Sequence, residues 1–183
     1  MTRQFTTKFM LATGFAAAMA LSTAALAQDK TAADKDSQKF IKNAIEGNLA
    51  EIDVGNLAQQ KGKSDAVKQY GAMLVKDHGA ANDKAKQVAS QLGVEPPTGS
   101  GVTSKATYLK LKVLSGDTFD RSFAKSMVSD HQADIKEYQK ESAKSDAAGA
   151  FAKETQPTLQ HHLQEAQSLV KETTTTGQGS SAK

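Results

Sequence analysis

Apolar residues recur along most of this chain with the spacing of one face of an α-helix. They return every third or fourth position in four stretches, over residues 36–60, 64–92, 117–142 and 146–172. This spacing matches the period of 3.6 residues per turn, and no stretch alternates between apolar and polar residues as a half-buried strand would. The pattern therefore predicts four long amphipathic helices and an all-α fold.

The segments between these helices contain helix-breaking residues. Residues 61–63 include a glycine, and Ser64 can cap the helix that follows. Residues 93–101 contain two prolines and three glycines, so a helix cannot continue through them. A short helix is expected over 104–114. Residues 36–172 then form one domain, a ferritin-like four-helix bundle with a long crossover containing a short helix between helices two and three.

The first 27 residues have the features of a secretory signal peptide. Arg3 and Lys8 precede an apolar, alanine-rich run, and residues 25–27 form the small-residue pattern of a cleavage site. We expect cleavage after Ala27 and a periplasmic or secreted product, with outer-membrane association as a narrower expectation. An uncleaved anchor is the alternative, because the apolar run approaches the roughly 18–20 residues that span a bilayer.

The two ends of the mature chain are polar and poor in large apolar residues. Residues 28–35 are expected to be a flexible N-terminal segment, and residues 173–183 are expected to be a disordered tail. No segment after the signal peptide is apolar enough to cross a bilayer, so no transmembrane domain is expected once the signal has been cleaved.

Composition narrows the classes of function. Only two of the 23 basic residues and none of the 20 acidic ones lie in the predicted signal peptide, so the mature chain is close to neutral. A near-neutral chain without tryptophan offers no basis for nucleic-acid binding. The chain contains no cysteine, no Gly-x-Ser-x-Gly elbow and no phosphate-binding loop, so no catalytic motif is predicted. No feature identifies a protein partner.

The candidate site residues are polar side chains on the apolar faces of the predicted helices. The phrase Val-x-Asp-His occurs twice, ending at His78 and His131 near the middle of two predicted helices, which indicates a duplicated helical hairpin. On a helical wheel, His78, His131 and His162 fall on the apolar faces of three different helices, and Glu51 falls on the apolar face of the first. Counted from the turns, the four lie at similar levels, so they can converge.

Imidazoles and a carboxylate together are typical ligands of Zn, Cu, Mn or Fe. We therefore predict one transition-metal ion in the bundle core, with these four side chains as ligands. Asp77 and Asp130 each precede a histidine and lie at the edges of the apolar faces, so we expect them to support the ligands or to contact another helix rather than to bind the metal, with solvation at the surface as the alternative for both. The alternative is a metal-free structural or interaction module of the cell envelope, in which the same side chains form a buried hydrogen-bonded network.

Several short motifs resemble the bacterial family called domain of unknown function 4142. They are Gly-Asn-Leu-Ala-Glu at 47–51, Leu-Val-Lys-Asp-His at 74–78, Ser-Asp-His at 129–131 and Pro-Thr-Leu-Gln-His-His-Leu at 157–163. The resemblance covers about 37–170 and implies a ferritin-like fold in an exported, often envelope-associated protein, with no activity attached.

Di-iron bundles carry Glu-x-x-His on two helices. This sequence has none, so iron storage or ferroxidase activity is not predicted, and a His-rich site favours Zn or Cu.

Overall fold

The structure is a computed structural model that describes residues 34–178. The predicted signal peptide over 1–27, most of the predicted N-terminal segment and residues 179–183 lie outside the described residues. The helices of the described part are α1 (Lys35–Lys61), α2 (Asp65–Gln91), α3 (Val102–Lys112), α4 (Gly116–Glu141) and α5 (Ala147–Gln178).

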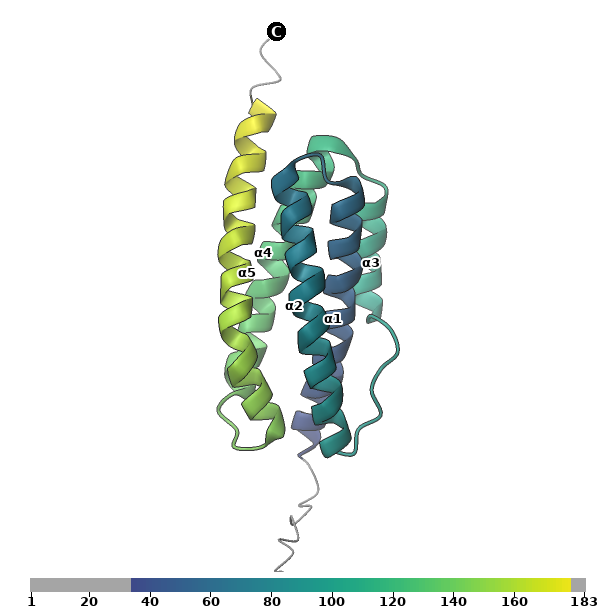
Figure 1. Ribbon diagram of the computed structural model, residues 1–183, viewed down its shortest axis with the longest axis vertical. Helices are drawn as coiled ribbons and strands as arrows, with labels where there is room; N and C mark the ends of the chain where they lie inside the picture. The colour runs from purple at the N-terminus through teal and green to yellow at the C-terminus, as the bar shows by residue number, and fades with distance from the viewer. Residues whose placement is uncertain (1–33, 179–183) are drawn as a thin grey trace, which may run out of the picture. The chain divides into compact units, whose positions relative to one another are not determined.

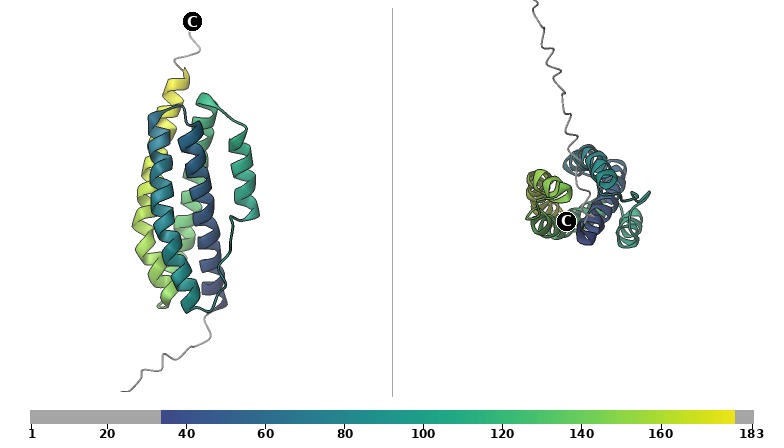
Figure 2. Two further views of the ribbon diagram at one scale, coloured as in Figure 1. Left: turned by 45° about the vertical axis from the view of Figure 1, so that its right-hand side comes forward. Right: turned by 90° about the horizontal axis from the view of Figure 1, so that it is seen from below.

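The four long helices run side by side, and the short helix α3 lies on the outside of the bundle (Figure 1). α1 packs mainly against α2 and α4 packs mainly against α5, so the bundle is built from two helical hairpins. The principal contact between the hairpins is that of α2 with α5, and α3 rests on α1 and α4 (Figure 2). The predicted all-α bundle with a helix in its crossover is confirmed.

The turn between α1 and α2 is held by side chains from two parts of the chain. Ser64 caps α2 as predicted, because its hydroxyl oxygen accepts a hydrogen bond from the Val67 amide at 3.2 Å. The buried carboxylate of Asp120, on α4, accepts hydrogen bonds from the amides of Lys63 and Ser64, both at 2.9 Å. One acidic side chain thereby ties the second hairpin to the turn of the first.

Two apolar clusters fill the bundle and leave a polar layer between them. The cluster at the end nearer the α1–α2 turn includes Leu57, Val67, Leu74, Phe119, Phe123 and Met127. The cluster at the opposite end includes Phe40, Ile41, Ile45, Tyr138, Phe151 and Leu159. On α4, His131 lies between Met127 of the first cluster and Tyr138 of the second. The inward histidines thus occupy a layer with a hydrophobic cluster on either side.

The last helix is longer than the sequence pattern predicts. It was expected to end at Glu172 with a disordered tail from Thr173, but α5 continues to Gln178. Thr173 is buried, and the hydroxyls of Thr173, Thr174 and Thr175 donate to the carbonyls four residues earlier at 2.7, 2.6 and 2.6 Å. Threonine side chains can make this bond only in a helical backbone, so the polar composition of this segment does not end the helix.

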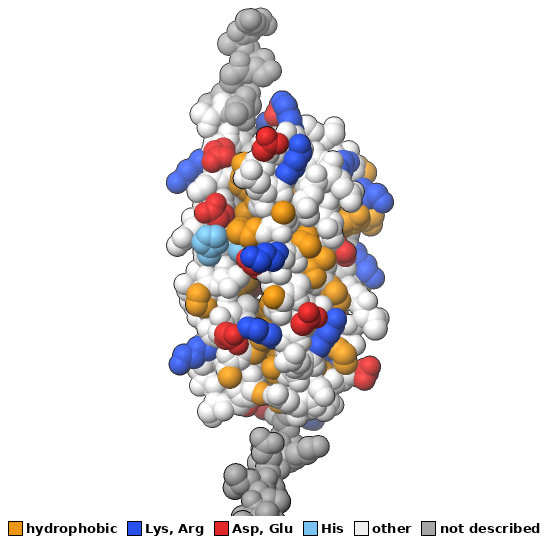
Figure 3. Space-filling view, viewed as in Figure 1, with side chains coloured by type: hydrophobic (Ala, Val, Ile, Leu, Met, Phe, Trp, Pro, Cys, Tyr) orange, Lys and Arg blue, Asp and Glu red, His pale blue; other side chains and the backbone are white. Residues whose placement is uncertain are grey.

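The outer surface carries charges of both signs. On the face shown in Figure 3, basic and acidic side chains are interspersed rather than gathered in patches. Within the described residues, no helix is long and apolar enough to cross a membrane.

Candidate metal centre

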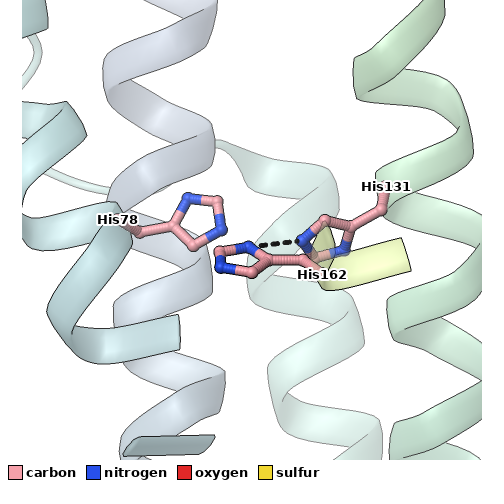
Figure 4. Close-up of side chains that lie close together, drawn as sticks. All are labelled: His78, His131 and His162. Atoms are coloured by element: carbon pink, nitrogen blue, oxygen red, sulfur yellow. Dashed lines mark hydrogen bonds between the residues drawn. The ribbon is translucent and has the colours of Figure 1, made fainter. Parts of the chain in front are cut away.

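The three predicted histidines come together in the polar layer. His78 on α2, His131 on α4 and His162 on α5 turn their rings toward one another (Figure 4). His131 and His162 are 0% exposed and His78 is 4% exposed. One ring nitrogen of each lies within 4.8 Å of a ring nitrogen of each of the others. Residues from three helices and both hairpins therefore form one compact group of possible metal ligands, called here the histidine trio.

Each histidine of the trio uses one ring nitrogen for a contact with an oxygen atom outside the trio. The three contacts are His78 Nδ1 to Asn48 Oδ1 at 2.9 Å, His131 Nδ1 to the Met127 carbonyl at 2.9 Å, and His162 Nε2 to Asp77 Oδ2 at 3.1 Å. Amide and carboxylate oxygens accept hydrogen bonds, so these three nitrogens are the ones that carry the proton. The hydrogen bonds fix both the orientation and the tautomer of each ring.

The other three ring nitrogens are left with lone pairs inside the trio. His131 Nε2 and His162 Nδ1 face each other at 3.3 Å, and His78 Nε2 is buried without a hydrogen-bond partner. Facing lone pairs repel unless a cation lies between them. The 3.3 Å contact drawn in Figure 4 is a hydrogen bond when one of the two rings is protonated on both nitrogens or takes the other tautomer. A tetrahedral zinc ion with Zn–N bonds of 2.0–2.1 Å also separates its nitrogens by about 3.3 Å.

Burial keeps the trio in the neutral form that metals bind. Burial and, to a smaller extent, the nearby His162 lower the pKa of His131 to about 4, against the opposing effect of the hydrogen bond to the Met127 carbonyl. Burial also lowers the pKa of His78 well below its usual value of 6.5, with His131 and His162 adding to the effect. The pKa of His162 is lowered by burial too, although Asp77 opposes the shift. Near pH 7 the lone pairs are therefore available without displacing protons.

Glu51, the fourth predicted ligand, does not join the three histidines: the group of possible ligand atoms within 4.8 Å of one another contains no carboxylate oxygen. It lies on α1 and lines a separate cavity of about 160 Å³ together with Asp130 and Asp134 of α4. Burial raises the pKa of Glu51 well above its usual value, and the carboxylates of Asp134 and Asp130 raise it further. The structure thus places Glu51 inside the protein, as predicted, but in an acidic cavity beside the trio.

The two predicted supporting aspartates take different positions. Asp77 contacts His162 on α5 rather than its own neighbour His78, so it acts between helices. Asp130 lines the cavity that contains Glu51. Asn48, which holds His78, was not predicted. It lies on the apolar face of α1 three positions before Glu51. Its position on the helical wheel, the same signal that indicated Glu51, therefore also indicates this amide.

The fold and the site define an all-α bundle with a buried histidine trio. The chain belongs to the family described as "Domain of unknown function (DUF4142)", which matches residues 20–169. No curated protein matches the chain. It is similar to a solved structure titled "Crystal structure of DUF305 fragment from Deinococcus radiodurans", with a TM-score of 0.68 and 11% identity over 76% of this chain and 97% of that one. At this identity the likeness concerns the fold alone.

Proposed function

We propose that this protein is an exported metal-binding bundle whose histidine trio holds one transition-metal ion. The observation that carries the proposal is the pairing of one nitrogen of each ring with an outer acceptor, which leaves a second buried nitrogen on each ring in a group whose ligand atoms lie within 4.8 Å of one another. Metal-binding histidines commonly donate their second ring N–H to a carboxylate or a carbonyl group. All three histidines of the trio have such a partner.

The donor set favours zinc or copper over manganese or iron. Three neutral imidazole nitrogens suit Zn and Cu, whereas Mn prefers oxygen ligands. A cavity of about 20 Å³ borders His78, Asn48 and Asp134, which is room for about one water molecule. Of the trio, this cavity borders only His78, so three protein nitrogens are the ligands that the structure supplies, as in zinc sites with three protein ligands and an open fourth position.

A metal-free network is the second candidate, and the contact between His131 and His162 supports it. With one proton between these rings, the chain of contacts runs from the Met127 carbonyl through both rings to Asp77. Such a network can fix the register of α2, α4 and α5 without a metal. His78 Nε2 remains without a partner in this arrangement, which favours the metal-bound form.

The test is metal content and metal affinity of the mature protein. Protein purified without an affinity tag is analysed by mass spectrometry for bound metals and then titrated with Zn²⁺ and Cu²⁺ by calorimetry after chelation. We expect about one equivalent per chain in the wild type and loss of binding in His162→Gln. His161→Gln is the matched control, because His161 is the exposed neighbour with a side chain that is 58% accessible. Equal binding by both variants, or none by the wild type, would overturn the proposal.

Export has its own test. Cleavage after Ala27 removes a segment of defined mass, so intact mass spectrometry of protein from the periplasmic fraction can identify the mature terminus. A product that begins at Gln28 supports export and cleavage, whereas an uncleaved chain in the membrane fraction supports the anchor alternative.

A further inference from the structure

A second cluster of ligand-type side chains surrounds the cavity between α1, α4 and α3. Three carboxylic side chains from α1 and α4 line it, and three hydroxyl side chains of α3 close its outer side. These residues are Glu51, Asp130, Asp134, Thr103, Ser104 and Thr107. In the part of the chain that the structure describes, the remaining lining residues are glycine, alanine and valine, and no basic side chain borders the cavity. Every polar side chain around the cavity therefore offers oxygen atoms.

Glu51 is the residue that points to a ligand. It is only 6% exposed, and its Oε2 atom is buried without a hydrogen-bond partner. Within the described residues, none of the three acids forms an ion pair with a lysine, arginine or histidine. A buried carboxylate without a partner is costly, and either protonation or a bound cation removes the cost.

We propose that this cavity is a second cation site, separate from the histidine trio, which binds Ca²⁺ through the carboxylates of Glu51, Asp130 and Asp134. Calcium takes six to eight oxygen ligands from carboxylates, neutral oxygens and water, and it tolerates irregular geometry. The three carboxylates line one cavity, but their oxygens do not form a group within 4.8 Å, so at least one of them must move inward or reach the ion through a bound water. The volume of about 160 Å³ accommodates an ion with several waters.

The chemistry of this cavity differs from that of the trio. The trio offers soft to intermediate nitrogen donors that prefer zinc or copper, whereas the cavity offers hard oxygen donors that prefer calcium. The two sites therefore respond to different ions, and one can exist without the other.

The test is a calorimetric titration of the mature chain with Ca²⁺ at pH 8, after treatment with chelator. We expect one saturable site in the wild type. Glu51→Gln and Asp134→Asn should each bind Ca²⁺ at least about tenfold more weakly, a loss of about 1.4 kcal/mol in binding free energy, because each replaces a charged ligand with a neutral amide. Both variants keep the shape of the side chain, and circular dichroism spectra of both are compared with that of the wild type to check that they fold. Asp53→Asn, an exposed position on α1, is the matched control and should bind within about twofold of the wild type.

Two outcomes overturn the proposal. One is the absence of a saturable signal in the wild type up to about 5 mM Ca²⁺, roughly five times the weakest dissociation constants, of about 1 mM, of extracellular calcium modules. The other is equal affinity in Glu51→Gln and Asp53→Asn, which would place the ion elsewhere on the surface. His162→Gln removes a member of the trio and should leave Ca²⁺ binding unchanged, so the result is independent of the transition-metal site.

Discussion

The contact between Asp77 and His162 determines which nitrogen of that ring can bind a metal. The carboxylate accepts from Nε2 and so directs the lone pair of Nδ1 into the trio. Asp77→Asn weakens this control, because an amide can present its NH₂ group to the ring instead. We expect zinc affinity to fall about 10- to 100-fold, the usual effect of losing such a partner.

Asp83→Asn is the control for this prediction, since Asp83 lies on the same helix but is exposed. Calorimetric titration with Zn²⁺ measures both variants beside the wild type. Unchanged affinity in Asp77→Asn would show that the aspartate does not orient the ring.

Glu51 should make stability depend on pH in a direction that can be worked out. Its pKa is raised in the folded state by burial and by the carboxylates of Asp134 and Asp130, from a usual value of 4.5. Above pH 4.5 the unfolded chain releases this proton before the folded chain does, so Glu51 costs increasing stability as the pH rises. Glu51→Gln removes the cost, and we expect a gain in the free energy of unfolding that increases from pH 4.5 to pH 8.

Urea unfolding in chelator measures this gain. At pH 4.5 the gain should be small, because Glu51 is protonated in the folded chain and only half ionised in the unfolded one. A gain of the same size at pH 4.5 and pH 8 would instead indicate a packing effect of the substitution.

At the scale of the helices, two glycines allow α1 and α2 to pack closely. A Cβ atom added to Gly71 would lie 2.6 Å from the Gly55 carbonyl oxygen, and one added to Gly55 would lie 2.7 Å from the Gly71 carbonyl oxygen. Gly71→Ala must push the helices apart, and we expect a loss of about 1–3 kcal/mol in the free energy of unfolding.

Gly79→Ala provides the matched control on the same helix. Nothing lies within 4 Å of a Cβ atom added there, so alanine should stabilise α2 by about 0.5–1 kcal/mol through its better helix propensity. Thermal or urea unfolding of both variants gives the comparison. A loss in both would mean that the close approach of α1 and α2 is not the cause.

The periodicity of apolar residues was sufficient to predict which histidines are buried, but not which other side chains lie next to them. The 3.6-residue pattern shows which face of a helix is buried, and His78, His131 and His162 are indeed buried together. The same pattern correctly placed Glu51 inside, but it does not show which neighbours a buried face meets. Here α3 returns over α1 and α4, so Glu51 meets Asp130 in the cavity beneath that helix.

The end of α5 shows a different limit of the sequence pattern. Composition predicts disorder from Thr173, because small polar residues bury little apolar surface. The backbone is nevertheless helical to Gln178, and the hydroxyls of Thr173 to Thr175 bond to carbonyls within this helix, so polar composition alone does not end a helix that is packed over most of its length. Asn48 is harder to predict from the sequence, because burying an uncharged amide costs much less than burying a carboxylate and so does not by itself indicate a site.

At the scale of the whole molecule, a metal in the trio would join the two hairpins. His78 belongs to the α1–α2 hairpin, and His131 and His162 belong to the α4–α5 hairpin. Most packing lies within each hairpin. A metal bound by residues of both hairpins therefore strengthens the interface between the hairpins, where the packing is less extensive. Because the unfolded chain does not hold the three rings together, a bound metal stabilises only the folded state.

This linkage predicts a defined rise in stability. Free Zn²⁺ at one hundred times its dissociation constant should raise the free energy of unfolding by about 2.7 kcal/mol, and at one thousand times by about 4.1 kcal/mol. Urea unfolding at several zinc concentrations measures the slope. His161→Gln should show the same slope and His162→Gln should show none. If zinc binds but the slope is flat, the ion binds folded and unfolded chains alike, and the trio does not hold the hairpins together.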